Sequence, residues 1–172
     1  MLERFDRALC HTVTWLSYLA CAIITCIFVM IVIDVSIRMS GITPPAFTLA
    51  VVEYSLLWFA MCSAPWLVRE RGHVVIEALV AILPEVVRNA LAKIVYLLCA
   101  AIAALFAFYS TQLLLEALAT MEADVRGIDM PLWSKYVPMP IAFSLMTLEF
   151  LMYLFGLRSY YTYDLGEVKD GV

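Results

Sequence analysis

The chain has 172 residues, of which 65% are hydrophobic and 15% are charged, and its formal net charge is −4. A soluble domain is roughly 45–50% apolar and about 25% charged, so 11 basic and 15 acidic side chains are too few to cover a soluble fold of this length. The hydrophobicity excludes a disordered chain, and the negative charge does not favour nucleic acid. The composition predicts a small helical membrane protein without a sizeable domain outside the lipid.

Two segments in the N-terminal half are long and apolar enough to cross a bilayer, which takes about 20 helical residues. The first, residues 12–33, carries no charge. It is too long for the apolar core of a signal peptide, so we interpret it as a retained span. The second, residues 46–68, follows the helix-breaking Thr43-Pro44-Pro45 and contains one charged residue, Glu53, near its start.

Two further spans are predicted in the C-terminal half. Residues 94–115 carry no charge, and we expect their helix to begin earlier, near Pro84, because proline suits a first helical position and Glu85 suits the positive end of the helix dipole. Residues 136–157 form the fourth span and contain Glu149 well inside. Four continuous apolar runs with short connections predict an all-α bundle. The strands of a membrane β-barrel would instead show apolar and polar residues in alternation.

The distribution of basic residues predicts the orientation of the chain in the membrane. With four spans, the two termini and the second connection share one side. That side holds eight basic residues, Arg4, Arg7, Arg69, Arg71, Arg88, Lys93, Arg158 and Lys169. The other side holds three, Arg38, Arg126 and Lys135. The positive-inside rule then places both termini in the cytoplasm.

The connection between the second and third spans predicts an amphipathic helix. Residues 73–83 are too apolar for a loop and too short to span. At helical spacing His73, Glu77 and Arg88 fall on one narrow polar stripe, and the rest of the surface is apolar. This pattern favours a helix lying in the membrane interface, next to the charged segment 69–72. Alternatively, the second helix continues and re-enters the bundle, or the stripe faces a partner subunit.

No pattern in the sequence predicts catalysis or a cofactor. The chain has no glycine-rich phosphate loop, no H-E-x-x-H and no G-x-S-x-G. Its five cysteines lie in or beside apolar runs, which is typical of small buried hydrophobic residues and does not indicate a disulfide or a zinc site. The two histidines, His11 and His73, lie near the cytoplasmic face, where they could in principle hold a haem. Their positions at helix ends favour solvated side chains instead.

Two acidic residues lie in predicted spans. An intramembrane carboxyl group costs a few kcal/mol unless it is protonated, solvated or paired, and neither run contains a Lys or Arg. Glu53 is interpreted either as a subunit contact or as an interfacial residue that reaches the headgroups. Glu149 has apolar runs on both sides, and we expect it to be a neutral acid that is hydrogen-bonded across helices. A contact with another subunit or an ion path is the functional alternative.

Four spans without repeated broken helices lack the inverted-repeat core of a complete secondary transporter, which indicates an accessory subunit. Three segments resemble the small membrane subunit of the tripartite ATP-independent periplasmic (TRAP) transporters, the DctQ-like family. They are VEYSLLWF at 52–59, RERGHVVIE at 69–77 followed by LPE at 83–85 and Arg88, and MPLWSKYVP at 130–138. The resemblance extends over roughly residues 10 to 160, and the number and order of the spans also match the family.

The resemblance implies a subunit that binds a large multi-span membrane partner, which carries the substrate and sodium sites and moves the substrate in an elevator-like motion. It also implies a separate periplasmic protein that captures a carboxylate or another organic acid and docks on the outer face. The small subunit is expected to hold the stationary part of the assembly in the bacterial inner membrane and to offer part of that docking surface. It implies neither catalysis nor a cofactor.

The candidate site residues are therefore charged side chains that contact another subunit or lipid headgroups. They are Glu53, Arg69, Arg71, His73, Glu77, Arg88 and Glu149. The alternative function is a small membrane anchor of a redox complex, which a haem absorbance spectrum would reveal.

Overall fold

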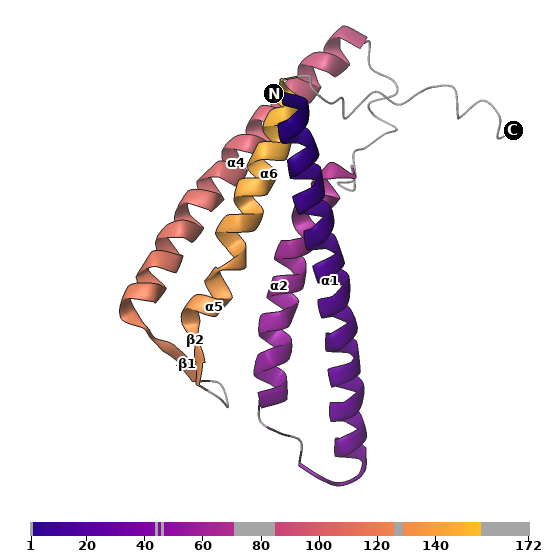
Figure 1. The fold of residues 1–172 in the computed structure, drawn as a ribbon, viewed down its shortest axis with the longest axis vertical. Coiled ribbons are helices and arrows are strands. Elements are labelled where there is room, and N and C mark those ends of the chain that lie inside the picture. The colour runs from indigo at the N-terminus through magenta and orange to yellow at the C-terminus, as the bar shows by residue number, and fades with distance from the viewer. Residues whose placement is uncertain (1, 44, 46, 71–84, 126–128, 156–172) are drawn as a thin grey trace, which may run out of the picture.

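The computed structural model describes residues 2–43, 45, 47–70, 85–125 and 129–155 (Figure 1). The helices in this part of the chain contain four segments that are long and apolar enough to cross a membrane. These segments are Asp6–Met39, Phe47–Arg69, Ala90–Thr120 and Leu132–Leu154. The predicted all-α membrane fold with four spans is therefore confirmed.

The first helix, α1 (Leu2–Met39), extends beyond the predicted span at both ends. Asp34 and Arg38 do not end it, because they are one turn apart and form an ion pair of 2.8 Å between carboxylate and guanidinium. The helix stops where Gly41 adopts a positive φ of 76°. The Gly41 N–H then donates to the carbonyl of Arg38 at 3.1 Å, which satisfies a group that the helix end leaves open.

The second helix, α2 (Phe47–Arg69), begins immediately after the two prolines that the sequence analysis identified as helix breakers. Thr48 marks this start, since both its N–H and its hydroxyl bond the carbonyl of Pro45, at 3.3 and 3.1 Å. Pro65 lies inside the helix and is buried. It has no N–H, so one helical hydrogen bond is missing in the last turns of α2.

The third long helix, α4 (Glu85–Thr120), starts directly after Pro84, as the sequence predicts. The chain then forms two short strands, β1 (Ala123–Val125) and β2 (Asp129–Pro131). They pair antiparallel, with Asp124 opposite Met130. The sequence analysis did not predict this small hairpin, because three-residue strands leave no readable alternation of apolar and polar residues.

The last span consists of α5 (Leu132–Tyr136) and α6 (Pro138–Leu154). Val137 between them still has helical dihedral angles, with φ −51° and ψ −47°. The interruption arises because Pro138 and Pro140 have no N–H with which to continue the helical ladder. The helical segment that is long and apolar enough to cross a membrane begins at Leu132, and the predicted span 136–157 begins inside it.

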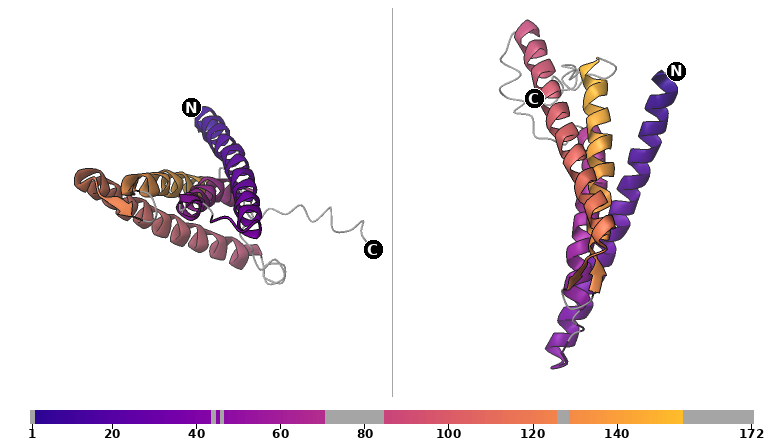
Figure 2. Two further views of the ribbon diagram at one scale, coloured as in Figure 1. Left: turned by 90° about the horizontal axis from the view of Figure 1, so that it is seen from below. Right: turned by 90° about the vertical axis from the view of Figure 1, so that its left-hand side faces the viewer.

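The helices pack as two antiparallel pairs, α1 with α2 and α4 with α6, and α2 contacts α6 to join the pairs. The two pairs diverge in Figure 1 toward the end that carries the strands. Seen end-on, α2 lies between α1 and α6 (Figure 2, left). Helix α2 is thus the central element that connects the first and second halves of the chain.

Two small clusters of buried side chains lie near the end of the molecule where the chain begins. One joins Val68 of α2 to Tyr96 of α4 and Tyr153 of α6. The other joins Leu9 and Val13 of α1 to Met152 of α6. All four long helices therefore meet at this end, which the two clusters hold together. The interfacial helix predicted at 73–83 lies outside the described residues.

Candidate functional site

A buried ion pair connects α2 to α6. The carboxylate of Glu149 is 0% exposed, and its Oε1 lies 3.2 Å from Nη1 of Arg69, whose side chain is 13% exposed. Arg69 is the last residue of α2, where a cation also interacts favourably with the negative end of the helix dipole. The pair thus brings together two of the seven predicted site residues.

This contact gives Glu149 a hydrogen bond to another helix, as the sequence analysis expects, and its partner is an arginine. Helices α2 and α6 run in the same direction (Figure 1), and Glu149 lies only about one and a half turns before the end of α6. Glu149 therefore lies at the same height as the end of α2. Arg69, at that end, is the first residue after the predicted span 46–68. A search for a cation inside the apolar run alone could not find this partner.

Tyr153, one turn after Glu149, completes the connection at this end. Its hydroxyl donates to the carbonyl of Arg69 at 3.0 Å and lies 3.5 Å from the carbonyl of Val68. These carbonyls belong to the last turn of α2, which has no helical partners for them. The Tyr153 ring also stacks on Tyr96 of α4, with 5.6 Å between centroids. We call Arg69, Glu149, Tyr153 and Tyr96 the Arg69 cluster.

A second group of polar contacts connects the first half of α2 to the hairpin and α5. The hydroxyl of Tyr54 lies 3.2 Å from Oδ2 of Asp124 in β1. The indole N–H of Trp58 donates to the carbonyl of Ser134 in α5 at 3.0 Å. The ammonium group of Lys135 stands 6.0 Å from the centre of the Tyr54 ring, at the outer limit of a cation–π contact. We call these residues the Tyr54 cluster.

Glu53 lies beside the Tyr54 cluster on the exposed side of α2. It lines a surface hollow of about 370 Å³, together with Tyr54, Leu56, Leu57, Ala60 and Lys135. The hollow therefore contains a carboxylate and an ammonium group against an apolar wall. This location agrees with either sequence interpretation of Glu53, a subunit contact or an interfacial residue.

The other four predicted site residues cannot be placed in a site from the described part of the chain. Arg71, His73 and Glu77 lie outside the described residues. Arg88 lies in α4, but its side chain is outside the described part of the chain. The sequence analysis in turn missed Tyr153, Tyr96, Tyr54 and Asp124 as contact residues. The spacing of Glu149 and Tyr153, one helical turn apart in an apolar helix, is the signal that could have indicated a polar contact to a neighbouring helix.

Within the described residues, no group of three or more His, Cys, Asp or Glu side chains could hold a metal ion. His11, one of the two haem ligand candidates, accepts a hydrogen bond on Nε2 from the indole N–H of Trp15 at 2.9 Å. His73, the other candidate, is outside the described residues.

Much of the apolar surface of the long helices is exposed. In the most apolar stretch of α1 only 11% of the residues are buried, and in that of α4 22%. The exposed side chains include Phe28 of α1 at 68% and Phe108 of α4 at 60%. Since four helices cannot cover each other in this arrangement, these faces are suited to lipid or to a membrane partner.

The fold and these contacts define a multi-pass helical membrane protein whose central helix is bonded in both of its halves and whose outer helices are exposed. The comparison with protein families agrees with this class. Residues 27–159 match the family described as tripartite ATP-independent periplasmic transporters, DctQ component. The chain belongs to this family, a component of transporters and not an enzyme family. The same comparisons gave no match among curated proteins and none among solved structures.

Proposed function

We propose that this chain is the stationary small subunit of a sodium-coupled TRAP transporter that imports a carboxylate-type organic acid. Its partners are a large multi-span membrane subunit, which carries the substrate and sodium sites, and a periplasmic substrate-binding protein. Membership of the DctQ family supports the tripartite assembly.

The exposed apolar surface of α1 is the observation that carries the proposal. Along α1, Tyr18, Phe28 and Ile33 are 65%, 68% and 52% exposed, although they lie in a helix apolar enough to span a membrane. Helices α1 and α4 each pack mainly on one neighbour, so the rest of their apolar surface is open to lipid or to a membrane partner. Two long helices with open faces suit a subunit whose packing is completed by a larger protein.

The bonds in both halves of α2 support a stationary role. The Arg69 cluster fixes its last turn to α6 and α4, and the Tyr54 cluster fixes its first half to β1 and α5. A helix held in both of its halves resists sliding and rotation relative to its neighbours. This is the property required of a subunit against which another subunit moves.

We further propose that the protein lies in the bacterial inner membrane with both termini in the cytoplasm. The excess of basic residues on the side of the termini supports this orientation. The Arg69 cluster then lies at the cytoplasmic face and the Tyr54 cluster at the periplasmic face. An alkaline phosphatase fusion should be inactive at Val172 and active after Gly41, and the reverse pattern would contradict the orientation.

Co-purification from mild detergent tests the proposed assembly. The tagged chain should bring down one large multi-span protein, and reconstituted uptake of a carboxylate should require this chain, the large subunit, the binding protein and a sodium gradient. A stable homo-oligomer without a partner, or uptake that continues when this chain is omitted, would contradict the proposal. Uptake that needs all three proteins but no sodium would refute the coupling alone.

Two charged residues are proposed to contact the partner, Glu53 at the exposed hollow and Arg71 beyond the end of α2. Glu53→Ala and Arg71→Ala should lower co-purification or uptake. The matched control is Leu98→Ala, because Leu98 is 60% exposed on α4 and carries no charge. Equal recovery of the large subunit in all three variants would refute the assignment of these residues, while the family membership would stand.

A further inference from the structure

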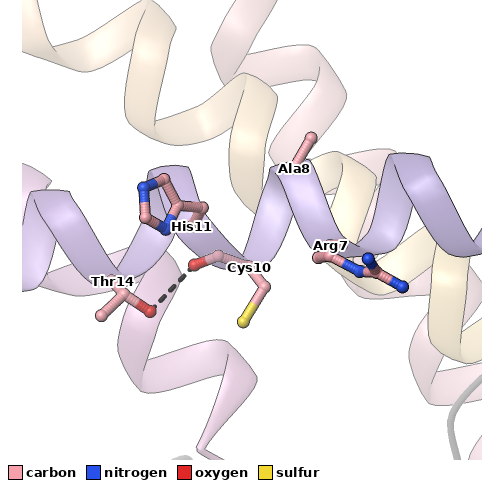
Figure 3. A pocket seen from close by; sticks show the side chains of 5 residues that line it. All are labelled: Arg7, Ala8, Cys10, His11 and Thr14. Carbon is pink, nitrogen blue, oxygen red and sulfur yellow. Dashed lines mark hydrogen bonds between the residues drawn. The ribbon is translucent and has the colours of Figure 1, made fainter.

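The outward face of α1 carries a mostly apolar hollow near the start of the helix, separate from both clusters described above. Its volume is about 510 Å³, and the described residues that line it are Arg7, Ala8, Cys10, His11 and Thr14 (Figure 3). The Arg7 and His11 side chains are exposed and lie one helical turn apart on α1. In Figure 3 the Arg7 guanidinium extends toward the start of α1, away from the His11 ring. Because both residues are exposed and lie one turn apart on α1, an Arg7 side chain that turns toward His11 can reach the same ligand.

The hollow lies on the side of α1 that faces away from the other helices. Leu9 and Val13 are 5% and 0% exposed, and they pack on α6. At 100° per residue, Arg7, His11 and Tyr18 fall on the opposite face, and Tyr18 is 65% exposed. No described helix therefore covers this stripe.

A hydrogen bond orients the imidazole of His11. The indole N–H of Trp15 donates to Nε2 of His11 at 2.9 Å, so the neutral ring carries its proton on Nδ1. Nδ1–H is then available as a donor on the same stripe as Arg7. The rings of Trp15 and Tyr18 are 62% and 65% exposed and lie edge to face, with 6.5 Å between centroids. Exposed Trp and Tyr rings of this kind are typical of the membrane–water interface.

The position of the hollow along α1 matches the depth of lipid headgroups. Arg7 and His11 precede the uncharged stretch 12–33, in which exposed apolar side chains such as Leu19, at 46%, continue along the helix. A ligand at this place meets the donors of Arg7 and His11 and, farther along α1, an apolar wall. The donors suit a phosphate group, because guanidinium N–H groups form strong charge-assisted bonds to phosphate oxygens.

We propose that this hollow binds an anionic phospholipid. The phosphate group contacts Arg7 and Nδ1–H of His11, and the acyl chains lie along the outward face of α1 past Trp15. The argument is independent of the transporter function and rests on charge complementarity, on the oriented imidazole and on the apolar surface that continues below it.

Quenching of Trp15 fluorescence by brominated lipids tests the proposal on the full chain in nanodiscs. Phosphatidylglycerol and phosphatidylcholine with brominated acyl chains are compared, and the signal of Trp15 is isolated as the difference from Trp15→Phe. Phosphatidylglycerol should quench at a lower mole fraction than phosphatidylcholine. Since one basic side chain near an anionic lipid surface contributes about fivefold in affinity, Arg7→Gln should reduce the preference by about that factor.

Arg38→Gln is the matched control, because Arg38 is an exposed cation at the opposite end of the same helix. A preference that is lost in Arg7→Gln and kept in Arg38→Gln supports the site. Equal quenching by both lipids in the unmodified chain would overturn it, and so would a preference that Arg7→Gln leaves unchanged. Absence of Trp15 quenching by either lipid would show that protein covers this face, which also overturns the proposal.

Discussion

Removal of Arg69 should destabilise the protein more than removal of its partner Glu149. Arg69→Met leaves a carboxylate that is 0% exposed without this guanidinium, and such a loss costs about 3 to 5 kcal/mol in the free energy of unfolding. Glu149→Gln leaves the arginine at the end of α2, where its 13% exposed side chain can extend toward the headgroups. This second change should cost only about 1 to 3 kcal/mol.

The double variant distinguishes this explanation from simple damage to packing. In the Arg69→Met background, Glu149→Gln removes the buried charge, so the double variant should be more stable than Arg69→Met alone. Unfolding by sodium dodecyl sulfate in mixed micelles, followed by far-ultraviolet circular dichroism, measures all three variants. Lys93→Met is the control, since Lys93 is an exposed cation near the same end of the molecule. Additive effects, or a cost of Arg69→Met no greater than that of Lys93→Met, would refute the reasoning.

Substitutions at three further positions give smaller expected effects on the same unfolding measurement. Tyr153→Phe removes the hydroxyl that bonds the Arg69 carbonyl and should cost about 1 kcal/mol, with the ring stack preserved; an unchanged transition would contradict this role. Gly41→Ala should cost about 1 to 2 kcal/mol through its positive φ alone, since an added Cβ meets nothing within 4 Å. Gly41→Asn should cost less, because Asn tolerates this conformation, and equal losses would indicate another cause. Tyr54→Phe should lose about 1 kcal/mol with its contact to Asp124, and greater stability in the variant would argue against that bond.

The number and order of the spans could be predicted from the sequence because length and apolar composition determine them. The ends were harder to predict, as α1 shows. Asp34 looked like the end of a span, yet its pairing with Arg38 lets the helix continue to Met39. A charge ends the apolar run without ending the helix.

The contacts between helices could not be predicted in the same way. Helices that are apolar on nearly every side have no pattern that tells which face meets a neighbour. Glu149 and Arg69 are 80 positions apart, and Tyr54 and Asp124 are 70 apart, so their pairing depends on the relative height and rotation of separate helices. The resemblance identified the transporter component family without identifying these bonds.

The ion pair between Arg69 and Glu149 also has a consequence for biogenesis. A ribosome completes α2 long before it synthesises α6, so the arginine is already in the membrane when the glutamate arrives. Insertion of a carboxylate into lipid costs a few kcal/mol. Arg69, already inserted at the depth that Glu149 reaches, lowers this cost. Entry of the last span should therefore depend on the correct placement of the second, and a chain with a displaced α2 should leave its C-terminal span outside the bilayer for quality-control proteases to degrade.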